Sequence, residues 1–243
     1  MKIQQLFDEL EKIKETSKLD FEKSGMVNRF KEMKYGFFPL GWGILDENNK
    51  TDGSPTTDEI DEGGVMVLGN DFGTVNYVEK DCNDIGETEG KTVNNLIKRA
   101  MLDTYKTFFT NFYLGVRLDD GLYCGTTMTK RMYDGKVNKL KNCYKNLCND
   151  FFKIQLELIK PRIVICLGHE VKNALIDSGI SFHKWKPKTG SFEKLYAMDG
   201  ARYIVENMEL NGIKFIIIPH PSYLVNLLKP PYLEKLNAFL KSN

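Results

Sequence analysis

The stretch from Leu156 to His169 reads LELIKPRIVICLGH, and it decides the fold. Its first residues complete a helical pattern that extends over residues 143–159, and Pro161 then prevents that helix from continuing. Five apolar residues follow at Ile163–Leu167, and Gly168 ends the run. A short, uninterrupted apolar run rich in β-branched residues is typical of a strand buried on both faces. The stretch therefore predicts a helix, a tight turn and a central strand.

Three further runs have the same character: Val65–Leu68, Phe108–Leu114 and Phe215–Ile218. Helical patterns lie between or after the runs, at residues 92–106, 143–159, 170–178 and 232–241. Strands that alternate with helices indicate a parallel sheet covered by helices on both faces. We therefore predict an α/β fold, a three-layer α/β/α sandwich around a central four-stranded parallel sheet.

The first 62 residues differ from the rest of the chain. Leu6, Leu10 and Ile13 recur at helical spacing, whereas residues 36–62 are rich in turn-forming residues and predict a long loop. We divide the chain into an N-terminal helical extension and loop at 1–62 and an α/β domain at 63–243. We expect the two to form one compact unit.

Polar residues follow or lie on each predicted strand near its carboxyl end. Because open parallel sheets bind ligands beyond that edge, the polar residues predict a functional cleft there. Polar residues also stand at strand ends simply because loops begin there, so any one of them indicates little. Taken together, they are Gly69, Asn70, Asp71, Asn111, Gly168, His169, His220 and Ser222.

Charge and length exclude some classes of protein. The net charge is +1, and no stretch is apolar enough to cross a bilayer or to act as a secretory signal. Basic residues gather between positions 130 and 145, which fits either a phosphate-binding surface or an ordinary solvated helix face. These residues are Lys130, Arg131, Lys136, Lys139, Lys141 and Lys145.

The cysteine pattern disfavours two kinds of structure. The five cysteines are odd in number and none forms a CxxC pair, so neither a metal finger nor a full disulfide framework is expected. A reducing, cytoplasmic environment fits this usage best.

In order and spacing, these motifs resemble the uracil-DNA glycosylase superfamily. The resemblance runs from about residue 64 to 228 and includes a glycine-led loop at Gly69–Gly73, a helix beginning at Gly90 and the pair Thr110–Asn111. The helix and strand around Cys148–Gly168 are most similar to the iron–sulfur branch of that superfamily. The loop His220–Leu224 completes the pattern.

The resemblance implies a monofunctional glycosylase that hydrolyses the N-glycosidic bond of uracil, or a related damaged base, flipped out of DNA. It implies catalytic roles for Asp71, which would stabilise the oxocarbenium or orient water, and for His220, which would stabilise the leaving base. It implies that Asn111 reads the base edge, because a carboxamide offers both a donor and an acceptor. Further base-binding positions are Gly69, Asn70, Phe72 and Tyr77, and DNA-binding positions are Gly168, His169, Ser222 and the candidate wedge Leu224.

Three departures from the family pattern leave alternatives open. Of the four cluster cysteines only Cys148 is in place, and Gly115 occupies another cluster position, so we expect no metal, cluster or other cofactor. Phe72 and Val93 stand where the family has a proline and a stacking phenylalanine. A catalytically inactive DNA- or partner-binding protein therefore remains an alternative. Gly73 favours a third reading, a glycosylase for hypoxanthine or mismatched thymine. In each case we expect a monomer that binds DNA and no membrane.

Overall fold

The computed structural model describes the parts of the chain that form the sheet and its main covering helix. Its described residues are 3–17, 27–29, 44–45, 62–71, 107–114, 116–117, 139–168, 171, 174–176, 212–218, 236–238 and 240–241. The helices among them include α1 (Ile3–Ser17) and α5 (Lys139–Ile159). The strands are β1 (Val27–Arg29), β2 (Ile44–Leu45), β3 (Val65–Gly69), β4 (Thr107–Asn111), β5 (Val116–Arg117), β6 (Ile163–Leu167) and β7 (Lys214–Ile218).

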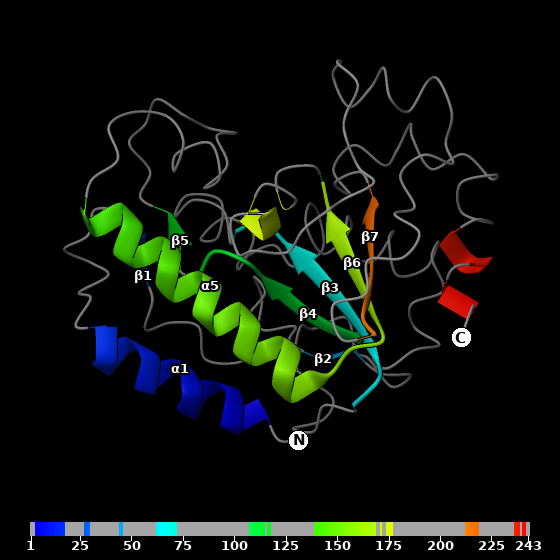
Figure 1. The fold of residues 1–243 in the computed structure, drawn as a ribbon, viewed down its shortest axis with the longest axis horizontal. Coiled ribbons are helices and arrows are strands. Elements are labelled where there is room, and N and C mark those ends of the chain that lie inside the picture. Colours follow the sequence, from blue (N-terminus) through cyan, green and yellow to red (C-terminus); the bar gives the residue numbers. More distant parts are fainter. Residues whose placement is uncertain are drawn as a thin grey trace, which may run out of the picture.

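The central sheet has the strand order β2-β4-β3-β6-β7. Strands β4, β3, β6 and β7 are all parallel, and their arrowheads point the same way in Figure 1. The predicted α/β/α fold with four central parallel strands is therefore confirmed. The short strand β2 adds an antiparallel edge beside β4, with Ile44 opposite Phe108.

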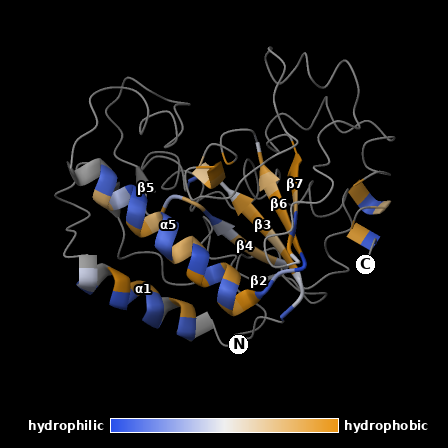
Figure 2. Ribbon diagram, in the orientation of Figure 1, coloured by the Kyte–Doolittle hydropathy of each residue, from blue (hydrophilic) through white to orange (hydrophobic). Residues whose placement is uncertain are grey.

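The four parallel strands are buried on both faces, as their apolar sequences predict. Every residue of β3, β4 and β6 is buried, and so is β7 from Phe215 onward. Figure 2 shows β6 as hydrophobic throughout, and β3 and β7 as hydrophobic over most of their length. Side chains alternate across a strand, so Met66 and Leu68 join the core cluster beneath α5 while Val65 and Val67 lie on the opposite face. A sheet buried on two faces is what a three-layer sandwich requires.

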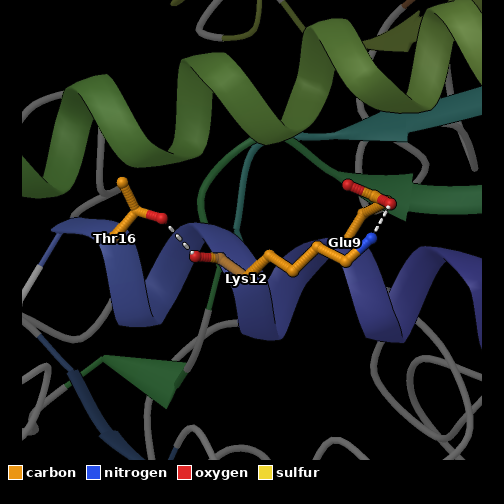
Figure 3. Close-up of polar contacts among 3 residues, drawn as sticks. All are labelled: Glu9, Lys12 and Thr16. Carbon is orange, nitrogen blue, oxygen red and sulfur yellow. Dashed lines mark hydrogen bonds and ion pairs between the residues drawn. The ribbon is translucent and has the colours of Figure 1, made fainter.

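Helix α5 covers one face of the sheet, and α1 packs against α5 on its outer side (Figure 1). The predicted apolar stripe of α1 makes this contact, because Leu6 and Leu10 are buried in the core cluster and Ile13 packs against it. Exposed polar contacts lie along the same helix (Figure 3): Lys12 Nζ is 2.6 Å from Glu9 Oε1, and Thr16 donates to the Lys12 carbonyl. The hydrogen bond and the charge of Glu9 raise the pKa of Lys12.

The end of α5 follows from its sequence. Lys160 has a φ of 45°, and its N–H donates to the Leu156 carbonyl at 3.0 Å, which is the single-bond form of a left-handed helix cap. Pro161 then stops the helix, and β6 begins two residues later. Arg162 holds the start of β6 by two hydrogen bonds. Its backbone N–H donates to the Gly64 carbonyl, and its side chain donates to the Leu240 carbonyl in the C-terminal helix.

The structure differs from the sequence-based expectation in two places. Residues 1–62 contain the short strands β1 and β2 as well as helix and loop, and β1 pairs antiparallel with β5. Strand β4 ends at Asn111 rather than continuing to Leu114. The side chains of Phe112, Tyr113 and Leu114 instead enter the core cluster, which explains their apolar character without a strand. The predicted helix at 92–106 lies outside the described residues.

Candidate functional site

The carboxyl edge of the sheet brings together residues that are far apart in sequence. Gly69 at the end of β3 pairs with Asn111 at the end of β4, and Leu167 of β6 pairs with Ile218 of β7. Neighbouring strands lie about 4.8 Å apart, so Asn111 and the loop that begins after Gly69 are immediate neighbours.

Two hydrogen bonds extend this pairing beyond the strands. The Phe112 N–H donates to the Gly69 carbonyl, and the Tyr113 N–H donates to the Asn70 carbonyl, both at 2.9 Å. The first residues of the loop after β3 are thus fixed against the segment that follows Asn111. Asn70 and Asn111 are both buried, with 8% and 1% of their surface exposed, so amide groups here are largely shielded from water.

The Asn70 side chain is directed at its neighbour. Its amide Nδ2 donates to Asp71 Oδ2 at 2.6 Å. This hydrogen bond orients the Asp71 carboxylate, and base binding by Asn70 stays a prediction. A bond to one carboxylate oxygen leaves further lone pairs of the carboxylate for other partners.

Gly168 occupies the same edge after β6. Its φ of 86° lies in the left-handed region, which glycine adopts without steric cost, and its N–H donates to the Ile218 carbonyl at 2.7 Å. The hydrogen bond joins the ends of β6 and β7. In the sequence, His220 follows Ile218 by two residues.

A match to a family model supports the arrangement of these strands and loops. The model of the uracil DNA glycosylase superfamily matches residues 59–241, which is most of the chain. The chain belongs to the uracil DNA glycosylase superfamily. This membership supports a DNA glycosylase type of function, in which the protein acts on DNA. A comparison with curated proteins gave no match.

The structure describes five of the site positions expected for this superfamily. These five lie at the carboxyl edge described above: Gly69, Asn70, Asp71, Asn111 and Gly168. The remaining positions lie outside the described residues: Phe72, Tyr77, His169, His220, Ser222 and Leu224.

A buried polar cluster behind Asp71 was not anticipated from the sequence. Tyr144 of α5 donates its hydroxyl to the Leu114 carbonyl, and its ring stacks on Tyr113 with centroids 6.3 Å apart. Burial raises the pKa of Tyr144 well above its usual value, and the nearby Cys148 and Asp71 add to the rise. The only sequence signal was the spacing of Tyr144 and Cys148, which places both on one face of the helix.

The residues around Cys148 do not fit an iron–sulfur cluster of the kind found in one branch of the superfamily. Burial raises the pKa of the Cys148 thiol to about 12, although a hydrogen bond from the Leu114 backbone opposes the rise. A cluster of this kind needs four Cys thiolates, and Gly115 stands at another of the four positions. Within the described ranges, no group of three or more His, Cys, Asp or Glu residues is placed to hold a metal ion.

Part of the basic cluster lies on α5. Lys139, Lys141 and Lys145 belong to the first two turns of that helix, whereas Lys130, Arg131 and Lys136 lie outside the described residues. Partial burial lowers the pKa of Lys145. No helix in the described part of the chain is long and apolar enough to span a membrane.

Proposed function

We propose that this superfamily member is a monofunctional uracil-DNA glycosylase. The observation that carries the proposal is the position of Asn111 beside the Gly69–Asp71 loop at the carboxyl edge of the sheet. This brings a carboxamide that can read a pyrimidine edge next to a carboxylate that can assist bond cleavage. The Asn70 hydrogen bond supports the role of Asp71, because it holds the carboxylate in one orientation.

The chemistry divides between the two ends of the breaking bond. As the N-glycosidic bond breaks, positive charge develops on the deoxyribose and negative charge on the departing base. In our proposal Asp71 stabilises the positive charge or orients the attacking water. His220 donates to the base oxygen and stabilises the anion, as an oxyanion hole does.

Recognition of the base falls to Asn111. Its amide can donate to a base carbonyl and its oxygen can accept from the adjacent N–H, a combination that uracil offers. Because Asn111 is buried, a mismatched partner would leave its polar atoms unsatisfied, and such sites discriminate strongly between substrates. We assign stacking on the base to Phe72 or Tyr77.

Binding of the surrounding DNA completes the proposal. A base inside a duplex must be flipped out before it can enter the site, and the unstacking costs a few kcal/mol. We propose that Ser222 binds a flanking phosphate, Leu224 fills the vacated space in the stack, and Gly168 and His169 line the DNA path. The protein acts as a monomer and without a metal or cofactor.

Single-turnover excision on oligonucleotides containing uracil, hypoxanthine or a G·T mismatch tests the proposal. His220→Ala should slow uracil excision about a hundred- to a thousandfold, the usual effect of losing an anion-stabilising donor. Asp71→Asn should slow it less, and Asn111→Asp should change or abolish the choice of base because a carboxylate cannot donate. If the unmodified protein cleaves none of these substrates, or if His220→Ala keeps its full rate, the proposal is wrong. Retained DNA binding without cleavage would support a binding protein built on this fold.

A further inference from the structure

Helix α5 holds the chain on both sides of Asn111, in β4 before it and in the segment after it. Before Asn111, the Thr110 hydroxyl donates to Gln155 Oε1 at 2.7 Å. After it, the Tyr144 hydroxyl donates to the Leu114 carbonyl. Both contacts are fully buried, and Gln155 and Tyr144 come from the same helix. Asn111 is therefore carried by a chain segment that one rigid element fixes at two points.

The presence of Gln155 in this core is not explained by packing. Its side chain is 1% exposed and lies among apolar residues of α5 such as Phe151 and Phe152. Its Nε2 makes no hydrogen bond in the described part of the structure, and an unsatisfied buried donor lowers stability. Methionine or leucine would fill the position without that loss. The amide oxygen of Gln155 accepts a hydrogen bond from Thr110, one residue before Asn111.

The Thr110 hydroxyl has two acceptors within reach. Gln155 Oε1 lies at 2.7 Å and the carbonyl of Asn111 at 3.5 Å. A hydroxyl has one proton to donate, so the shorter contact takes it. Without the Gln155 amide, the hydroxyl would be left to turn toward the Asn111 carbonyl and would pull on the peptide that carries Asn111.

We propose that Thr110 and Gln155 are a pair of positioning residues that fix the Asn111 carboxamide and thereby set the base selectivity of the site. The inference rests on the proposed function, in which Asn111 reads the base. Neither residue touches the base. Loss of the Thr110–Gln155 hydrogen bond displaces Asn111, which recognises the base, and leaves the catalytic residues in place. The base selectivity therefore changes more than the rate of the cleavage step.

Three valine or methionine substitutions test the pair by kinetics. Thr110→Val and Gln155→Met each remove the hydrogen bond while keeping the side-chain size, and Thr107→Val removes another buried hydroxyl from the same strand, four residues before Asn111. We expect the first two to lower the ratio of kcat/KM for uracil over cytosine, whose edge lacks the N–H beside a carbonyl, by about tenfold or more, since small misplacements of site groups have effects of that order. The Thr110→Val/Gln155→Met double variant should be no worse than either single variant. An unchanged ratio in variants that melt within a few degrees of Thr107→Val would overturn the proposal.

A second measurement does not depend on activity. Protein labelled with ¹⁵N-asparagine gives a side-chain amide signal for Asn111, which Asn111→Asp identifies by its loss. Thr110→Val and Gln155→Met should shift or broaden that signal, whereas Thr107→Val should leave it in place. If neither variant alters the signal, the pair does not position Asn111. A protein that excises no base would defeat the proposed function, and this spectrum would still decide the positioning role.

Discussion

Replacing Gly168 with alanine separates strain at the candidate site from a general loss of stability. Gly168 has a φ of 86°, and its N–H donates to the Ile218 carbonyl at the carboxyl edge. Gly212 has nearly the same φ, 84°, but precedes β7 at the opposite edge of the sheet. An alanine Cβ at Gly212 would meet no atom within 4 Å, so Gly212→Ala is a control for backbone strain alone.

The expected cost in stability follows from the backbone conformation. A non-glycine residue in the left-handed region costs about 1–2 kcal/mol. Alanine recovers about 0.4–1 kcal/mol of this by restricting the unfolded chain. Each variant should therefore lose about 1 kcal/mol, equivalent to a fall in Tm of about 2–4 °C for a chain of this size.

The two variants should differ in activity. Relaxation of the strain at Gly168 moves the junction between β6 and β7, where Gly168 donates to the Ile218 carbonyl. Ile218 lies two residues before His220 in the sequence. A displacement of about 1 Å can cost about a hundredfold in rate, so single-turnover uracil excision should fall about tenfold or more in Gly168→Ala. Gly212→Ala should retain a rate close to that of the unmodified protein. Equal rates in the two variants, at equal losses of Tm, would refute this account of the edge.

Three other predictions concern the packing of α1, the buried thiol and DNA binding. Leu10→Ala should destabilise the protein by about 2–5 kcal/mol in urea denaturation, because Leu10 is buried against α5. Glu11 is exposed, so Glu11→Ala should change the stability by less than about 0.5 kcal/mol. If both variants have a similarly small effect, α1 does not pack against α5. Burial raises the pKa of Cys148 to about 12, whereas the thiol of the unfolded chain has a pKa of about 8.5. The protonated Cys148 thiol therefore contributes its full stabilisation below about pH 8.5, and this stabilisation is lost as the pH rises toward 12. Cys148→Ala should therefore flatten the alkaline loss of unfolding free energy by about 1.4 kcal/mol per pH unit. DNA affinity should fall steeply, by about tenfold or more, between 50 and 200 mM salt in fluorescence anisotropy if phosphate contacts dominate, and a flat salt response would count against that mode of binding.

The central strands could be predicted because their sequences permit few other structures. The run Ile163–Leu167 is apolar throughout and is bounded by Pro161 and Gly168, and the observed strand has the same limits. The order of polar residues at strand ends similarly predicted that the loop after Gly69 and Asn111 lie at one edge of the sheet, where the two residues pair. The match to the family model confirms the membership that these motifs predicted.

Other features depend on contacts that a sequence does not display. Strand β2 has only two residues and exists because β4 offers it an edge, so no local pattern marks it. The pairing of Thr110 with Gln155 joins positions 45 residues apart, and each residue alone resembles an ordinary polar residue in an apolar stretch. The Asn70–Asp71 contact depends on side-chain rotamers, which the sequence does not specify.

Release of free uracil is the most direct test of the proposed function. The unmodified protein, in excess over a duplex with one uracil and in the presence of EDTA, is incubated and the small-molecule fraction is analysed by mass spectrometry. The account predicts one free uracil per duplex, with a strand that stays intact until alkali cleaves the abasic site. An absence of free uracil, or a strand break before alkali is added, would contradict it.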